Sequence, residues 1–171
     1  MKKQTSTMAA GLVISLVLIV FALVIYFMNL YTETWNAYLG IGLFVLCLVL
    51  AILNHAKEKE NRVTFGQLFA YGFKTTAVVI CIMIIYTLVS GYVFPDVKQN
   101  LIEKARADAM SVPNANESQV EQGMAMFEKN YTLFIIMGLL FWYLVCGAII
   151  SLITAAITPK KPVDNHEFEK V

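Results

Sequence analysis

Charged residues are scarce in this chain of 171 residues, where Asp, Glu, Lys and Arg together make up only 15%. Soluble domains average about 25% charged and about 45–50% apolar residues, whereas 58% of this chain is hydrophobic. A folded domain of this length still exposes a large part of its surface, so it could not hide the apolar excess from water. The composition therefore excludes an ordinary soluble enzyme and a disordered chain. The net charge of +1 gives no excess of positive charge with which to bind nucleic acid.

Four stretches of the chain contain no Asp, Glu, Lys or Arg, and each is longer than 20 residues. A helix of about 20 residues crosses a hydrocarbon core of about 30 Å, and it satisfies its own backbone groups where lipid offers no partner. We therefore predict an all-α fold, an integral-membrane four-helix bundle, in one domain over residues 1–171. All four prolines lie outside the predicted spans. These spans are residues 8–30, 36–54, 70–93 and 131–157.

Residues that carry chemistry are few and scattered. Cys47, Cys81 and Cys146 each fall in a different span without a CxxC neighbour, so we interpret them as small apolar residues. The two histidines, His55 and His166, are distant in sequence and do not indicate a metal site. The chain has no GxSxG, HExxH or glycine-rich phosphate motif, and no span contains a carboxylate. We expect no catalytic residue, no cofactor and no metal, and hence a protein that is not an enzyme.

Basic residues are unevenly divided between the segments that flank the predicted spans. Nine of the thirteen Lys and Arg residues lie before the first span, between the second and third, or after the fourth. Because Lys and Arg in short loops favour the cytoplasm, we predict that both termini, including the tail over residues 159–171, are cytoplasmic. The inner segments then carry +4 and the outer segments −3. A cleavable signal peptide is the alternative for the first span, but its apolar stretch is too long and no small-residue cleavage site follows it.

The segment between the third and fourth spans, about residues 95–130, is the only outer segment long enough to fold. Apolar residues recur every four positions over residues 96–110, which predicts a first helix there. A turn containing proline and asparagine follows, and Asn116 or Ser118 suits the cap of a second helix. Since its apolar phase continues into the fourth span, we predict one long helix from Asn116 to Ile157. The two helices would form an extracytoplasmic helical hairpin.

One face of the second outer helix is apolar. Val120, Met124 and Phe127 recur at spacings of four and three residues, and they are our candidates for an outer interaction face. Such a stripe serves either to recognise a partner or to pack inside the hairpin. Because the stripes consist partly of alanine and methionine, the pattern favours a structural connector, with a recognition surface as the alternative.

Aromatic residues gather at the ends of the predicted spans, where Tyr and Trp prefer the level of the lipid head groups. Core packing explains any single one of them equally well. The candidate interfacial anchors of this kind are Trp35, Tyr38, Tyr92 and Tyr131.

Lys74 is a further candidate anchor. No carboxylate within a span is available to pair with it, so we expect its long side chain to reach the head groups. It follows a segment with one aromatic face, residues 65–73, in front of which Thr64 is a suitable helix cap. We expect this segment to lie in the inner interface and to turn into the third span.

Small residues spaced four apart allow helices to approach closely in lipid. The pattern predicts helix packing, and it does not distinguish contacts within one chain from contacts between chains. The candidate packing residues are Gly11, Ser15, Gly147, Ser151 and Ala155.

Four segments together resemble a family of small, uncharacterised four-span proteins of the bacterial inner membrane, defined as a domain of unknown function. The resemblance covers about residues 8–161, and it implies four helices and a bacterial inner membrane. It implies no activity, so no functional residue is carried over. The segments are residues 64–73, 100–103 and 147–153 and the basic pair Lys160–Lys161.

These observations favour a non-enzymatic, multi-pass membrane protein that acts as an accessory or scaffold protein of the cell envelope through its outer hairpin. The alternative is a small transport or permeation component, which would need a polar path lined by residues such as Thr76 and Ser151. The lipid bilayer is the expected partner, and a second copy of the chain or another membrane protein is an open one.

Overall fold

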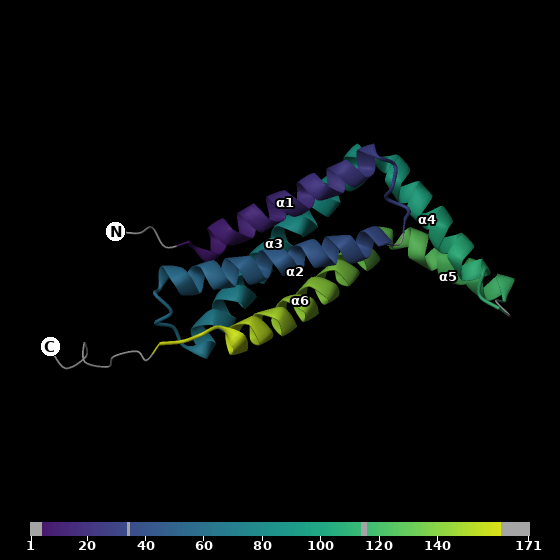
Figure 1. Ribbon diagram of the computed structural model, residues 1–171. Helices are drawn as coiled ribbons and strands as arrows, with labels where there is room; N and C mark the ends of the chain where they lie inside the picture. The colour runs from purple at the N-terminus through teal and green to yellow at the C-terminus, as the bar shows by residue number, and fades with distance from the viewer. Residues whose placement is uncertain (1–4, 34, 114–115, 162–171) are drawn as a thin grey trace.

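Six α-helices make up most of the part of the chain that the structure describes (Figure 1). The computed structural model describes residues 5–33, 35–113 and 116–161, and all regular secondary structure in these ranges is helical. Four of the helices, α1, α2, α3 and α6, are long and apolar enough to cross a membrane, which confirms that part of the predicted fold. The helices are α1 (Thr7–Phe27), α2 (Trp35–Glu58), α3 (Phe65–Val93), α4 (Pro95–Met110), α5 (Glu117–Lys129) and α6 (Tyr131–Ile157).

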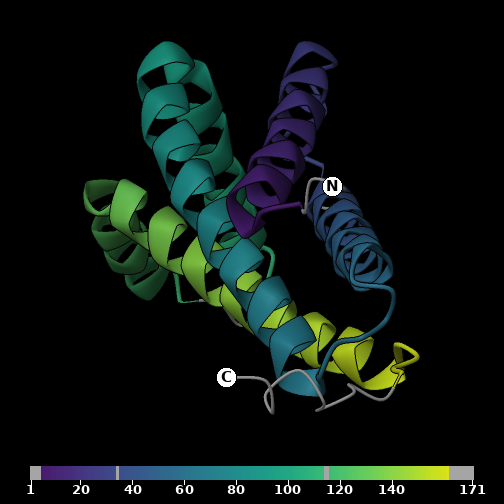
Figure 2. The ribbon, with the colours of Figure 1, turned by 90° about the vertical axis from the view of Figure 1, so that its left-hand side faces the viewer.

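The four long helices pack together into what we call the bundle. α3 contacts α1, α2 and α6, and α2 also contacts α1 and α6. The starts of α1 and α3 and the ends of α2 and α6 lie together at one end, which we call the terminal end (Figure 1). Seen from there, α3 crosses α6, with α1 and α2 beside them (Figure 2). At the opposite end, α4 and α5 pack against each other and form the hairpin.

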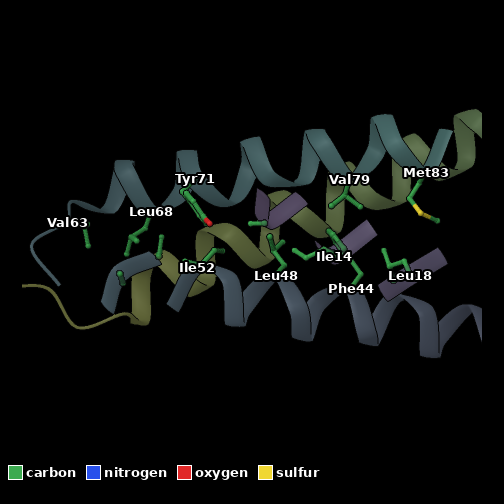
Figure 3. Packing of buried hydrophobic residues seen from close by; sticks show 13 residues of the cluster. Ile14, Leu18, Phe44, Leu48, Ile52, Val63, Leu68, Tyr71, Val79 and Met83 are labelled. Carbon is green, nitrogen blue, oxygen red and sulfur yellow. The ribbon is translucent and has the colours of Figure 1, made fainter. Parts of the chain in front are cut away.

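The core of the bundle is a narrow row of apolar side chains (Figure 3). α2 contributes Phe44, Leu48 and Ile52, which recur every four residues and are at most 1% exposed. Ile14 of α1 and Val79 of α3 meet this row from the neighbouring helices. The rest of each helix surface is also apolar but exposed, so the apolar residues extend far beyond what the core needs.

α3 begins directly after the predicted cap Thr64, five residues before the predicted third span (residues 70–93). Thr64 Oγ1 accepts a hydrogen bond from the Gln67 backbone N–H (3.2 Å), and Gln67 Oε1 accepts one from the Thr64 N–H (3.0 Å), which together form a capping box. Residues 65–73 are therefore the first turns of α3, behind the predicted cap Thr64, and they continue into the third span as one helix. Burial of Leu68 and Tyr71 in the bundle explains why these turns continue the helix.

The prediction of one long helix from Asn116 to Ile157 is wrong, because the structure divides this segment at Asn130 into α5 and α6. Asn130 has φ −113° and ψ 21°, and its Nδ2 donates a hydrogen bond to the Met126 carbonyl oxygen at 3.0 Å. Such side-chain bonds compete with a regular helical backbone. The direction changes here, and α5 packs against α4 instead of extending α6 (Figure 1). The cap of α5 is Asn116, whose side chain accepts from the Ser118 N–H.

Candidate functional site

A cavity of about 620 Å³ lies where the bundle meets the hairpin, and we call it the junction cavity. It is lined by the last turns of α1 and α3, the connection between α1 and α2, the starts of α2 and α6, and one side of α4. Its volume falls within the range of about 300–1,000 Å³ that is typical of small-molecule sites. The large apolar and aromatic residues of its wall include Phe21, Ile25, Tyr86, Phe94, Leu101 and Ile135.

Charges of both signs line the same cavity. Lys98, Lys104 and Asp108 belong to α4, and Glu33 belongs to the connection between α1 and α2. The Lys98 Nζ lies 5.5 Å from the centroid of the Tyr131 ring, within the range of a cation–π interaction. The cavity is therefore amphipathic, with apolar walls mainly from the bundle and charged groups from α4 and the connection between α1 and α2.

The connection between α1 and α2 holds α4 in place over the cavity. Asn100 Nδ2 of α4 donates a hydrogen bond to the Tyr31 hydroxyl at 2.6 Å, and Lys104 Nζ donates to a backbone carbonyl of the same connection. The rings of Tyr26 and Phe94 also pack with centroids 4.3 Å apart. These partners lie some 70 positions apart in sequence, so helical periodicity gave no signal for the cavity they build.

Asn36 is a buried polar residue in the wall of the junction cavity. Its side chain is 9% exposed, and its Nδ2 donates to the Leu30 carbonyl oxygen. Its Oδ1 is buried without a hydrogen-bond partner among the residues that the structure describes. An acceptor left in this state is costly, so a donor beside it would be stabilising.

The structure places the five predicted packing residues inside the bundle, where all of them are buried. A Cβ added to Gly11 of α1 would lie 2.7 Å from the Cβ of Val78 on α3. One added to Gly147 of α6 would lie 2.9 Å from the Cβ of Thr76 on α3. Neither distance leaves room for a side chain, so both helices approach α3 closely at their glycines, and these contacts lie within one chain.

The sequence interpretation missed Gly72, the third glycine of this kind. A Cβ on Gly72 of α3 would come within 2.6 Å of Ile52 Cδ1 and 2.9 Å of Ser151 Cβ. Three helices therefore meet at this position. Gly72 lies four residues before the β-branched Thr76, whereas the residues at this spacing from Gly11 and Gly147 are serines, and that Gly–Ser spacing was the signal that identified the other glycines.

The proposed interaction face of the hairpin is partly buried in the structure. Met124 is only 7% exposed on α5, and Val120 and Phe127 are half-buried. The Phe127 ring packs against Tyr131 and Phe134, at centroid distances of 5.6 and 5.7 Å. Met124 cannot contribute to an exposed face, because α5 packs this stripe inside the protein.

The candidate anchors lie at both ends of the long helices. Trp35, Tyr38 and Tyr92 are exposed at the hairpin end, with 48, 72 and 87% of their surfaces accessible. Tyr131 is half-buried at the start of α6, where it lines the junction cavity. Lys74 is exposed on α3, nearer the terminal end, where it lines a second cavity.

One comparison with known proteins gives a match. A family with the description "Protein of unknown function (DUF4199)" matches residues 9–160, which include all six helices except the first two residues of α1. No curated protein and no solved structure matches the chain.

Proposed function

The chain belongs to the DUF4199 family, whose function is unknown, so we propose a role from the placement of the chain's own residues. It is a non-enzymatic, four-span protein of the bacterial inner membrane, with both termini in the cytoplasm and the hairpin outside. Its function is to bind a zwitterionic phospholipid in the junction cavity. The observation that carries this proposal is the amphipathic wall of that cavity.

The outward surface of the bundle supports the membrane location. On α6 the large apolar residues Met137, Phe141 and Trp142 are 57–62% exposed, and α1 has a similar surface. In water this surface would be a strong aggregation hazard, whereas in a bilayer it faces lipid. The basic residues of the terminal end support the orientation, because such residues favour the cytoplasmic side.

The ligand follows from the size, walls and charges of the junction cavity. A volume of about 620 Å³ accommodates part of a lipid chain among side chains such as Phe21 and Ile25. The charged residues include two lysines and two carboxylates, so they complement a head group that carries a phosphate and an ammonium. The cavity lies at the level where the hairpin leaves the bundle, which is where the head groups of the outer leaflet would be.

The two roles expected from the sequence have weaker support. A scaffold that acts through the hairpin needs an exposed apolar face, and Met124 is buried. A permeation path needs an open polar lining, but Thr76 and Ser151 are at most 1% exposed and lie at close contacts with glycines. Binding at the junction cavity is better supported, because apolar and charged residues line the same cavity.

Photo-crosslinking tests the proposal. The full chain is reconstituted in nanodiscs with a phosphatidylethanolamine analogue that carries a diazirine in its acyl chain, and the labelled peptides are mapped by mass spectrometry. We expect labelling to concentrate on residues of the junction cavity. Ala105→Phe fills the cavity and should reduce this labelling about tenfold, a loss of about 1.4 kcal/mol in binding.

Ala107→Phe is the matched control, because Ala107 is exposed on the same helix and does not line the cavity. The proposal fails if labelling is spread evenly over the lipid-facing surface, or if the two phenylalanine variants behave alike. Pull-down of one stable partner through the hairpin, without lipid enrichment, would favour the scaffold. Solute flux that a Thr76 or Ser151 change alters would favour transport.

The orientation is tested separately. In a variant whose three cysteines are replaced by alanine, single cysteines are introduced at Ser111 and at Glu60. An impermeant thiol reagent added to intact cells should label Ser111→Cys and leave Glu60→Cys unlabelled. The reverse pattern would invert the proposed topology.

A further inference from the structure

A second cavity, of about 380 Å³, lies at the terminal end of the bundle, and we call it the basic cavity. It is lined by residues at the start of α1, the end of α2, the turn that follows α2, and the start of α3. Glu60 and Asn61 in this turn have φ values of 56° and 62°, which reverse the chain within a few residues. The reversal brings Lys59 and Arg62 to the same cavity as Lys74 of α3.

The charges at the basic cavity have one sign. Lys59, Arg62 and Lys74 line it together with His55, and none of its described lining residues is a carboxylate. None of the three basic side chains makes an ion pair within the described ranges of the chain. Glu58 lies close enough to act electrostatically on His55 and Tyr71, but it does not line the cavity. Its carboxylate accepts hydrogen bonds from the backbone N–H of Thr5 and the side chain of Asn54 at 2.7 and 2.9 Å.

Two buried polar atoms in the wall of this cavity also lack partners. The His55 and Tyr71 rings stack with centroids 3.9 Å apart and an interplanar angle of 12°. Tyr71 is 5% exposed and points from α3 into the bundle (Figure 3), and its hydroxyl has no hydrogen-bond partner among the described residues. The same is true of His55 Nδ1. Buried polar groups normally have a hydrogen-bond partner. Because these two atoms lie in the wall of the basic cavity, they indicate a ligand with oxygen atoms.

We infer that the basic cavity binds a phosphate group. A phosphate offers several acceptor oxygens and negative charge, which match a guanidinium and two ammonium groups that converge without a carboxylate. Either the head group of an anionic phospholipid or a free phosphate has this chemistry. The site is separate from the junction cavity, and it does not depend on what that cavity binds.

Isothermal titration of the purified full chain in an uncharged detergent tests the inference. The probes are dihexanoyl phosphatidylglycerol, inorganic phosphate and, as a ligand without net charge, dihexanoyl phosphatidylcholine. We expect saturable binding of at least one anionic probe. Arg62→Gln and Lys74→Gln should each weaken it about tenfold, and Lys74→Arg should retain most of it. Circular dichroism checks that each variant is folded.

Two control variants distinguish binding at the basic cavity from a general effect of charge and from binding at the junction cavity. Lys57→Gln removes the same charge from the last turn of α2 without touching the cavity, and it should change the dissociation constant by less than about twofold. Ala105→Phe blocks the junction cavity and should leave anion binding unchanged. If phosphatidylglycerol binds tighter than phosphate, the source is a lipid head group, and otherwise it is free phosphate.

Any of three results would overturn the inference. The first is that neither anionic probe binds saturably. The second is that phosphatidylcholine binds as tightly as phosphatidylglycerol with the same dependence on Arg62 and Lys74, and the third is that Lys57→Gln weakens binding as much as Lys74→Gln. Failure of the lipid crosslinking at the junction cavity would not affect these outcomes, because that experiment reports on the opposite end of the bundle.

Discussion

The bundle and the hairpin are both helical, but they are held together in different ways. In the bundle α3 alone buries eight residues, and glycines bring α1 and α6 close to it. In the hairpin α4 and α5 bury one residue each, Ile102 and Met124, and most of the remaining surface is polar. The bundle therefore depends on shape at many close contacts, whereas the hairpin depends on two apolar residues and a few hydrogen bonds. We expect the hairpin to open locally while the bundle stays folded.

The largest expected effect is at a glycine contact of the bundle. Gly147→Leu places a side chain where Thr76 already lies, and we expect it to lower the free energy of unfolding by about 3 kcal/mol through overpacking. Gly138→Leu is the control, since no heavy atom lies within 4 Å of a Cβ added there on the same helix. Unfolding in mixed micelles measures both. Equal destabilisation would contradict the close packing of α6 on α3.

The next effect is confined to the hairpin. Met124→Ala removes one of its two buried side chains and should destabilise it by about 2 kcal/mol. Met126→Ala, at a residue that is 62% exposed on the same helix, should have little effect. Hydrogen exchange should quicken in α4 and α5 for Met124→Ala and stay unchanged in the bundle. Equal quickening in the bundle would mean that the two regions unfold as one unit.

Removal of a helix cap should have a wider effect in the hairpin than in the bundle. Asn116→Ala and Thr64→Ala each remove a side-chain cap, at a cost of about 1 kcal/mol. In α5 the loss should speed hydrogen exchange over the whole helix, because little else holds it. In α3 it should affect only the first turn, since packing holds the rest. Ser118→Ala is the control for Asn116, and equally local effects in both helices would contradict this difference.

The smallest effect is expected where the two regions are joined. Tyr31→Phe removes the hydroxyl that accepts the Asn100 hydrogen bond and should destabilise the seating of α4 by about 0.5 kcal/mol. Hydrogen exchange in α4 measures the change. Tyr38→Phe, at a residue that is 72% exposed, is the control. If both variants leave α4 unchanged, the bond to Tyr31 contributes nothing to the junction cavity.

Local patterns predicted the helices well and their breaks poorly. The four uncharged runs led to the four long helices, because length and hydropathy are properties of the chain itself. The turn at Asn130 was missed, because the apolar phase of α5 continues into α6 and no proline or glycine lies near the turn, in residues 124–137. What bends the chain there is a side-chain hydrogen bond together with the packing of α5 on α4.

The candidate sites were less predictable than the fold. Small residues at a spacing of four drew attention to Gly11 and Gly147, but not to Gly72, whose close neighbours come from two other helices. Lys74 was expected to be a single interfacial charge. Its proximity to Lys59 and Arg62 depends on the chain reversal after α2, which no periodic pattern encodes.

The sequence by itself determined that this chain is helical, that four uncharged stretches are each long enough to cross a membrane, and that charge is concentrated outside those stretches. These properties follow from local composition and from the backbone's need for hydrogen bonds in an apolar medium. Only the tertiary structure decided which helices touch, where α5 turns from α6, and which scattered polar residues gather at the two cavities. Those outcomes depend on contacts between positions far apart in the chain, and such contacts leave no local pattern in the sequence.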